Sequence, residues 1–549
     1  MANNSLQIAP ISANSREFET DSFFQSGKRS TLTLFSSYRN PTKLSQFKIM
    51  KSLDEDTQYK IEFHWSHFFI AVAIHFSHIF FGPFILPLLY LVFGYCLCSN
   101  MSFCFSRLYL LEFFSFMWTI ITFVFCFVNP EQAHEWIGLV FCSAAIVGLK
   151  TLLLSIKYGF YSEKRWKEMK EKTIDREILR KEFIMRSWLN IPQEVIDWEL
   201  EKSFIRQSKS PYELCVSFET PLGDSCHKYL TDLIEKSGVE IFHDNSSHCK
   251  NTQCYPLIVI ASLYVKQISE DVISKWCMRF TILLSLIYTI LPFIAKYWIY
   301  GSFANDNNPL FILFAVISGL FSLWEVWGFL TFIYIGICDI RRKKLLMDEC
   351  TAMISDLEIK HTITYLNDIP VLDMRDPRTI ESWYSLRVAL LDFGRKYTAR
   401  VFAYISLVLP LSITMILIYF LQIFGIIGGA SSGALISLLY LTLLCLGVVT
   451  YMVFLGIESN EAFGIHKDLL LNIIGNIMKE NGYSDNEISP LASLRLLNFV
   501  VKKLKQDEAL RPVKIMWIRT DSALFTKIIA ILLSGLIAVL QSFGKQYAN

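Results

Sequence analysis

The feature that most limits how this chain can fold is a series of seven long apolar stretches. Each holds about 20 residues or more, and a helix of that length crosses the roughly 30 Å hydrocarbon core of a bilayer, since each residue adds about 1.5 Å. The stretches are residues 103–128, 136–160, 277–298, 310–338, 401–427, 434–457 and 523–543. The sequence therefore predicts an all-α polytopic membrane protein, a seven-helix bundle embedded in a lipid bilayer.

The composition of the chain agrees with a lipid environment. Hydrophobic residues make up 53% of the 549 residues and charged residues 19%, whereas an average soluble protein is about 25% charged. These values exclude an intrinsically disordered chain and a conventional soluble enzyme. The 52 Lys and Arg nearly balance the 50 Asp and Glu, so the whole chain presents no basic field to nucleic acid. We expect no nucleic-acid partner.

The positions of Lys and Arg predict how the helices are oriented, because positive residues near helix ends stay on the cytoplasmic side. Three short connections, 129–135, 301–309 and 428–433, contain no Lys or Arg. Three long connections carry basic clusters and are predicted to be cytosolic loops: 161–276, 339–400 and 458–522. The bundle then has an intracellular N-terminus and an extracellular C-terminus. We assign residues 1–66 to a polar cytosolic tail and residues 102–549 to the seven-helix domain.

An additional apolar segment near residues 68–98 does not fit a simple span. It is interrupted by Gly82, Pro83 and Pro87, which favour a kinked helix, a short hairpin or a helix in the membrane interface. Since the basic tail and the start of the first core helix are both predicted inside, zero or two crossings are favoured over one. We assign residues 67–101 to an extra membrane or interfacial segment.

Parts of the long loops have helical patterns of their own. Residues 162–198 form a charged run with i,i+4 Glu and Lys pairs, which favours a solvated helix. Apolar residues at three-to-four-residue spacing predict helices over 379–400 and 491–505. The first of these is predicted to continue without a break into the span that begins at Val401. We expect such extensions to pack on each other outside the membrane.

The last apolar stretch carries a recognisable motif. Residues 534–543 read SGLIAVLQSF and follow an aromatic and acidic element at 517–525. This pattern resembles the C-terminal motif of the insect gustatory and odorant receptor superfamily, in which Thr-Tyr is followed by five apolar residues and Gln-Phe. Here Ser534 and Gly535 stand where Thr-Tyr is usual, Gln541 matches, and the Phe is displaced by one position to Phe543.

The resemblance implies a ligand-gated cation channel in the plasma membrane, assembled as a homo- or heterotetramer and opened by a small-molecule ligand. In that family the last helix of each subunit lines a central pore for inorganic cations. Ser534, Ile537 and Gln541 share one helix face here, and Ile537 or Leu540 would close the path by dewetting. The alternative is that Gln541 sits at the membrane interface while the small residues permit close helix packing.

A buried acid marks a second candidate site. Glu325 lies in the middle of a predicted span, where an ionisable side chain is costly and often functional. Because the resemblance places the ligand pocket among the helices that precede the pore helix, Tyr288, Trp324 and Glu325 are the candidate ligand contacts. Glu112 and Lys150, in the first two spans, have a structural explanation, in which Lys150 is an ion-pair partner for Glu112 or Glu325.

Other groups of polar residues carry alternative functions. The four histidines 64, 67, 75 and 78 lie near one helical stripe, where a polar face is favoured over a metal site. We therefore predict no metal, no cofactor and, in the absence of catalytic motifs, no enzymatic activity. Two alternatives remain open: a transporter of a small solute, based on Glu325, Lys150 and the histidine stripe, and an intramembrane lipid-modifying enzyme, based on His75 and His78.

Overall fold

The described part of the chain is predominantly helical. The computed structural model describes residues 62–73, 214–220, 255–271, 275–300, 309–355, 371–423, 432–480, 488–510, 512–515, 518–523, 525–527, 529–531, 533–535, 537 and 541, with scattered positions elsewhere between 76 and 231. The helices are α9 (Leu257–Asp271), α10 (Lys275–Tyr300), α11 (Pro309–Ala352), α13 (Pro377–Asp392), α14 (Arg395–Ile423), α15 (Ser432–Glu480) and α16 (Ile488–Leu510). Two short antiparallel pairs join β1 (Cys215–Val216) to β2 (Tyr255–Pro256) and β3 (Lys514–Ile515) to β4 (Ile518–Arg519).

The prediction of an all-α membrane protein is confirmed in this general form. Within the described residues, three helices are long and apolar enough to cross a bilayer: Val316–Ala352, Thr398–Tyr419 and Leu439–Glu480. Shorter apolar helices cover Arg279–Leu291 and Phe525–Gly535. Most of the first two predicted spans lies outside the described residues, as does most of the 67–101 segment, whose described start is helical from Trp65 to Ala73.

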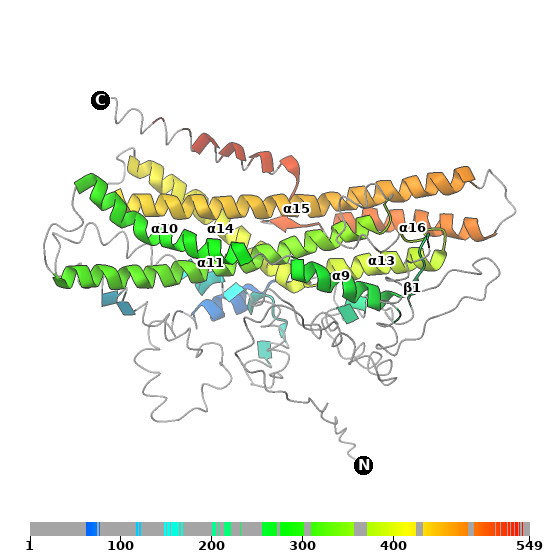
Figure 1. Cartoon of the computed structure of the whole chain (residues 1–549), viewed down its shortest axis with the longest axis horizontal. Coiled ribbons are helices and arrows are strands. Elements are labelled where there is room, and N and C mark those ends of the chain that lie inside the picture. Colours follow the sequence, from blue (N-terminus) through cyan, green and yellow to red (C-terminus); the bar gives the residue numbers. More distant parts are fainter. Residues whose placement is uncertain are drawn as a thin grey trace, which may run out of the picture.

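Two helices form the long axis of the molecule (Figure 1). At about 1.5 Å per residue, the 44 residues of α11 and the 49 residues of α15 measure about 66 and 74 Å. Both are about twice as long as a bilayer core requires, so each must extend out of the membrane. Helices α10 and α14 pack beside them at one end, and α9, α13 and α16 pack beside them at the other.

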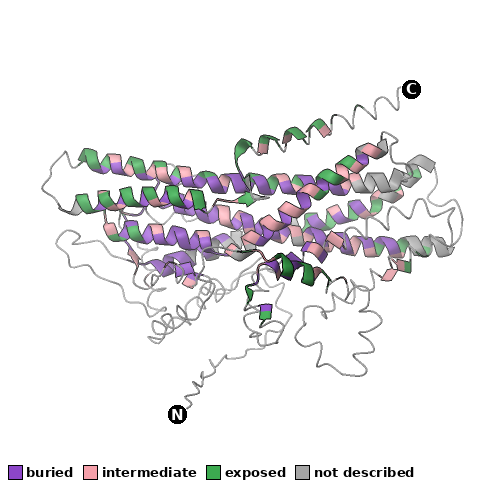
Figure 2. Cartoon of the chain, turned by 180° about the vertical axis from the view of Figure 1, so that it is seen from behind, coloured by how far each residue is buried: buried purple, intermediate pink, exposed green. Residues whose placement is uncertain are grey.

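The end that contains α10 and α14 has the surface of a lipid-embedded bundle. Its inner side is built from residues such as Phe329, Val408 and Val449. Its outer side exposes large apolar side chains, among them Leu320 at 61% and Leu417 at 56%. Apolar side chains at this density are unfavourable in water and favourable against lipid tails. Figure 2 shows this division, with buried residues on the facing sides of the helices and exposed residues on the outer sides.

The opposite end is a compact group of helices that we call the extramembrane cluster: α9, α13, α16 and the adjoining halves of α11 and α15. Its core contains Leu346, Trp383, Leu470 and Leu497, each fully buried. The stretches around 379–392 and 491–505, which the apolar spacing predicts to be helical, form parts of α13 and α16 and pack against each other.

The prediction of one continuous helix from residue 379 into the membrane is wrong. Helix α13 begins at an N-cap, where the Asp376 side chain accepts a hydrogen bond from the backbone N–H of Arg378, and it ends at Asp392. Gly394 then adopts a left-handed backbone with φ of 63°, and α14 starts at the next residue. The physical reason is the glycine, since only a residue without a Cβ takes this conformation at little cost.

Helix α11 also continues well past the predicted end of its span at residue 338. The basic residues that follow are good helix formers, and they make ion pairs along and between helices. Arg342 pairs with Asp339 at 3.0 Å, and Lys344 pairs with Asp348 at 2.9 Å and with Glu458 of α15 at 3.7 Å. These ion pairs therefore accompany the continuation of α11 beyond its predicted span, beside α15.

Candidate functional site

Two of the three candidate ligand contacts are buried between the apolar helices. Tyr288 on α10 is fully buried, and Glu325 on α11 has only 2% of its surface exposed. The third, Trp324, is half-buried, and its indole lies edge-on to that of Trp327 with ring centres 5.7 Å apart. A carboxyl group buried among apolar helices is costly unless polar neighbours or a ligand stabilise it. The burial of Glu325 is therefore the most informative property of this region.

Aromatic side chains connect α10 to α15 in the same region. The rings of Tyr288 and Tyr440 lie 6.1 Å apart, and the Tyr440 hydroxyl donates a hydrogen bond to the backbone oxygen of Leu284 at 3.1 Å. On α11, a Cβ added at Gly319 would lie 3.6 Å from Thr289 of α10, so these two helices also pack closely. Helices α10, α11 and α15 thus surround one partly polar region.

A line of polar side chains follows the buried side of α11. Ser318, Ser322 and Glu325 are spaced by four and three residues, which places them on one face, and Ser322 is 2% exposed. The indole N–H of Trp118 donates to the Ser318 hydroxyl at 2.7 Å. The buried Ser322 hydroxyl and Trp327 indole N–H have no hydrogen-bond partner among the described residues. Buried polar groups are normally satisfied by protein, water or ligand, so these two groups are candidates for contact with a polar ligand.

The predicted pore residues lie on a C-terminal helix that stands away from the bundle. This helix, drawn in red in Figure 1, leaves the molecule near the middle of its long axis and projects outward. Ser534, Ile537 and Gln541 are helical and exposed, with 53% of the Ile537 surface exposed. Leu540 lies outside the described residues. At the start of the helix, the ring of Phe525 lies 6.3 Å from that of Phe454 on α15.

The β3 and β4 hairpin fixes the start of this C-terminal helix to α15. The Asn460 side-chain amide donates to the backbone oxygens of Thr520 at 2.8 Å and Val513 at 3.1 Å, and its carbonyl accepts from the Val513 N–H at 2.8 Å. One turn earlier, a Cβ at Gly456 would lie 3.1 Å from Val513, so the hairpin approaches α15 closely. Asn460 was not predicted from the sequence, because a single Asn in a helix gives no signal of a contact more than 50 residues away.

A buried ionic network crosses the extramembrane cluster. Arg387 of α13 donates from Nε to Nδ1 of His466 on α15 at 2.9 Å, and His466 Nε2 lies 2.8 Å from the Thr351 hydroxyl on α11. The Thr351 hydroxyl donates to the backbone oxygen of Met347, so it accepts from Nε2. Asp507 of α16 lies 3.8 Å from the Arg387 guanidinium and balances its charge. The network therefore joins four helices.

His466 lies beyond the predicted membrane segment of α15, in a stretch that also holds Glu458, Glu461, Lys467 and Asp468. Burial, together with the neighbouring Arg387 cation, lowers the pKa of His466 well below its usual range. The ring is therefore neutral near pH 7, as its acceptance of a hydrogen bond at Nδ1 requires. The sequence did carry a signal for Arg387, since it falls on the apolar stripe that contains Trp383 and Leu390.

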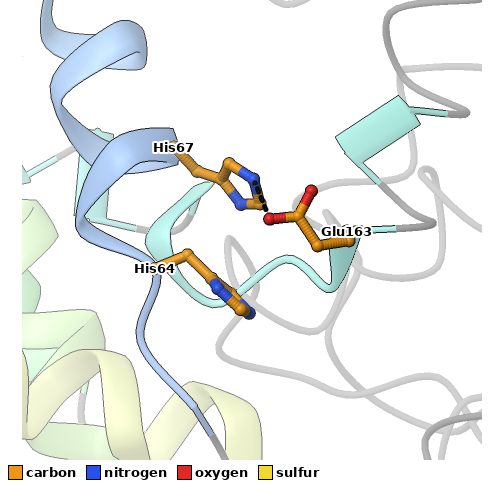
Figure 3. A group of neighbouring side chains, drawn as sticks. All are labelled: His64, His67 and Glu163. Carbon is orange, nitrogen blue, oxygen red and sulfur yellow. Dashed lines mark ion pairs between the residues drawn. The ribbon is translucent and has the colours of Figure 1, made fainter.

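Two of the four stripe histidines approach an acid from a distant part of the chain (Figure 3). His64, His67 and Glu163 each offer one ligand atom, and these atoms lie within 4.8 Å of one another. These three residues are the metal-binding candidate within the described part of the chain. The sequence prediction of no metal ligand did not consider Glu163 as a neighbour of this stripe.

Several other candidates cannot be placed, because Glu112, Lys150, His75 and His78 lie outside the described residues. The proposed pairing of Lys150 and the enzyme alternative based on His75 and His78 therefore stay predictions. The same holds for the 162–198 helix, of which few positions are described.

Comparisons of the chain with protein-family models, with curated proteins and with solved structures find no match.

Proposed function

We propose that the protein is a ligand-gated cation channel of the chemoreceptor type. A small molecule binds among α10, α11 and α15, near Tyr288, Trp324 and Glu325, and opens a pore lined by the C-terminal helices of four subunits. The observation that carries the proposal is the C-terminal helix, which is fixed at its start by the hairpin and is exposed along most of its described residues. The tetramer, homomeric or heteromeric, follows the resemblance of the C-terminal motif to the receptor superfamily.

The residues on this helix suit a boundary between lipid, neighbouring subunits and a hydrated path. Ile531, Leu533 and Ile537 are each more than half exposed, and Ser534 and Gln541 are exposed beside them. An isolated helix of this kind is unfavourable in water, but it is favourable when apolar side chains face lipid and small polar ones face hydrated ions. We propose Ile537 or Leu540 as the hydrophobic gate.

The proposal includes the orientation that the basic residues predict: seven spans, a cytosolic N-terminus and an extracellular C-terminus, in the plasma membrane. Three observed helices of sufficient length and apolarity support a multispan protein. The ion pairs that extend α11 beyond its apolar part support a cytosolic extramembrane cluster, because its basic residues lie at the membrane boundary.

Helix α15 provides a physical connection between the ligand region and the pore helix. Tyr440 contacts α10 near the proposed ligand site, and Asn460, 20 residues further along the same unbroken helix, holds the hairpin. Twenty residues of α-helix span about 30 Å. A ligand that shifts α15 would therefore move the hairpin and the start of the pore helix with it.

The test is current through the full-length protein reconstituted in planar bilayers, with Ile537→Ala compared with Ile531→Ala. Both residues are exposed isoleucines of the same helix, but six positions place them about 120° apart. Because Ile537→Ala removes bulk from the proposed gate, we expect its ligand-independent current to rise at least severalfold, while Ile531→Ala resembles the original protein. Equal currents in the two variants would exclude Ile537 as the gate, and absence of cation current from all of them would contradict the channel.

A transporter is the second candidate, and the burial of Glu325 favours it, because buried acids couple proton or ion movement to solute movement in such proteins. It predicts electrically silent uptake of a labelled solute into vesicles. In that case Glu325→Gln would abolish uptake, whereas Ile537→Ala would leave it unchanged. The bilayer currents and the uptake assay together separate the two functions.

A further inference from the structure

Two segments that are far apart in the sequence pack tightly beside the start of the extra apolar segment. The backbone N–H of His64 donates to the backbone oxygen of Gly159 at 2.7 Å. A Cβ added at Gly159 would lie 2.3 Å from the Phe63 ring, so a larger residue would force the segments apart. This contact brings residues 62–73 against residues 158–163 and places two histidines next to an acid (Figure 3).

The ligand atoms of this group lie close to the spacing that a tetrahedral metal centre requires. His67 Nε2 lies 3.2 Å from a Glu163 carboxylate oxygen. Two ligands at about 2.0 to 2.1 Å from one zinc ion lie about 3.3 to 3.4 Å apart in tetrahedral geometry. The separations among all three groups stay within 4.8 Å. Rotation of His64, which is half-buried, and of Glu163, which is 76% exposed at its side chain, supplies the remaining shift.

The surroundings of His67 hold its ring in the orientation that a metal ion needs. Its Nδ1 lies 3.2 Å from the backbone oxygen of Tyr161. Because that oxygen can only accept, Nδ1 donates, and in the neutral ring the Nε2 lone pair faces Glu163. The Trp166 ring stacks on His67 with centres 4.5 Å apart and planes 15° apart, which fixes the ring plane. Metal-bound histidines typically have this arrangement, with the second nitrogen bonded to a carbonyl.

A lone pair that faces a carboxylate is repulsive unless a positive charge lies between them or the ring is protonated. A protonated His67 ring would form a simple ion pair with Glu163. Such an ion pair does not involve the third residue of the group, His64. The half-buried His64 ring lies 4.9 Å from the His67 ring, centre to centre, and one ligand atom of His64 lies within 4.8 Å of those of His67 and Glu163. The closeness of two imidazoles and one acid favours a metal ion over a single ion pair.

We propose that His64, His67 and Glu163 bind one divalent transition-metal ion, with zinc as the favoured ion. Imidazole ligands select zinc-class ions over calcium and magnesium, which prefer oxygen ligands. Three protein ligands leave a fourth position for water or another ligand. The bound ion joins the helix at residues 65–73 to the chain that follows Gly159, independently of whether the protein conducts ions.

The experiment titrates full-length protein in detergent micelles, after treatment with a chelator, with Co²⁺ and then with Zn²⁺. We expect visible absorption bands of tetrahedral Co²⁺ that saturate at one equivalent and disappear when Zn²⁺ displaces the cobalt. We expect Glu163→Gln to weaken metal binding about 10-fold or more. Removing a residue that only hydrogen-bonds to a ligand already weakens metal affinity by about 10-fold or more, and removing a ligand itself should weaken it further. Glu163 is largely exposed, so this substitution leaves folding intact.

The matched control is Glu62→Gln, which removes an exposed carboxylate close to His64 in the sequence but not in the group. The metal affinity of this variant should stay within about threefold of that of the original protein. This change is well below the loss expected on removing a ligand. His64→Ala should weaken binding as Glu163→Gln does. Absence of metal binding by the original protein, or an identical titration by Glu163→Gln, would overturn the proposal and leave His67 and Glu163 as an ion pair.

Discussion

At the scale of single residues, the stability of the extramembrane cluster depends on the charge of Arg387, which is buried and surrounded by side chains of the cluster. Arg387 has no exposed surface, donates to His466 and lies with its guanidinium 4.6 Å from the centre of the Phe463 ring. Tyr384 donates to the Asp507 carboxylate at 3.1 Å, which holds the counter-charge in place. Removing one partner from such a group leaves a buried charge uncompensated, which is strongly destabilising. The network therefore specifies one arrangement of α11, α13, α15 and α16.

The neutral state of His466 predicts how the cluster responds to acid. Below about pH 6.5 the unfolded chain takes up a proton at this histidine, whereas the folded chain does not, because the pKa of His466 is lowered in the fold. The free energy of unfolding should therefore be unaffected by this residue above about pH 6.5. It should fall as the pH drops below that value, with a slope approaching about 1.4 kcal/mol per pH unit.

The measurement is chemical unfolding of the purified protein in detergent between pH 7.5 and 5, with His466→Gln as the comparison. The glutamine carbonyl can still accept from Arg387, but the side chain does not titrate. The other histidines contribute to both proteins, so the difference in slope belongs to residue 466. The same pH dependence in both proteins would contradict the assignment.

At the scale of elements, the joint between α13 and α14 separates the extramembrane cluster from the bundle. Helix α13 ends where the backbone N–H of Phe393 bonds to the oxygen of Ala389, and α14 begins immediately after Gly394. Phe393 is 3% exposed and belongs to the cluster core. The left-handed Gly394 thus lets a buried helix in the cluster turn into a membrane helix within two residues.

Two glycine substitutions should change stability in opposite directions. Gly394→Ala places a Cβ on a left-handed residue and should destabilise the protein by about 1 to 2 kcal/mol. Gly464→Ala is the control, since Gly464 lies inside α15 with no atom within 4 Å of an added Cβ, and it should stabilise by about 0.5 to 1 kcal/mol. Thermal unfolding in detergent measures both. A stabilising Gly394→Ala would contradict the role of the joint.

At the scale of the whole molecule, the chain combines an apolar bundle with a polar cluster through α11 and α15. Each of these helices contributes to both cores, so a tilt of either helix moves residues at both ends. The C-terminal helix departs from the middle of this assembly (Figure 1), next to the boundary between the two cores. Its start is therefore held beside α15, a helix that belongs to both cores.

The proposed orientation predicts opposite accessibility for two tags. A tag after Asn549 should be cleaved by protease added to intact cells, because the last span is proposed to end outside. A tag inserted within 481–487, between α15 and α16, should be cleaved only after the membrane is opened. Protection of the C-terminal tag in intact cells would contradict the topology, the resemblance to the receptor superfamily and the pore together.

The sequence alone was sufficient to predict the membrane character of the chain and the approximate positions of several described helices, but not α9 or the far ends of α11 and α15. Hydropathy and helical spacing are local properties, so runs such as 310–338 and 491–505 are recognisable without knowledge of their neighbours. It also indicated that Glu325 is exceptional, because an acid inside an apolar run is visible in the sequence. The sequence prediction failed at the break after Asp392. The apolar spacing there outweighed Phe393 and Gly394, where the helix ends.

Tertiary structure alone decided which polar residues meet. His466 bonds to partners 79 and 115 residues away, and Asn460 holds backbone groups 53 and 60 residues further along the chain. Glu163 reaches His67 for the same reason, through the close approach at Gly159. Contacts of this kind depend on how helices are placed beside each other, and no local pattern of side chains encodes that placement.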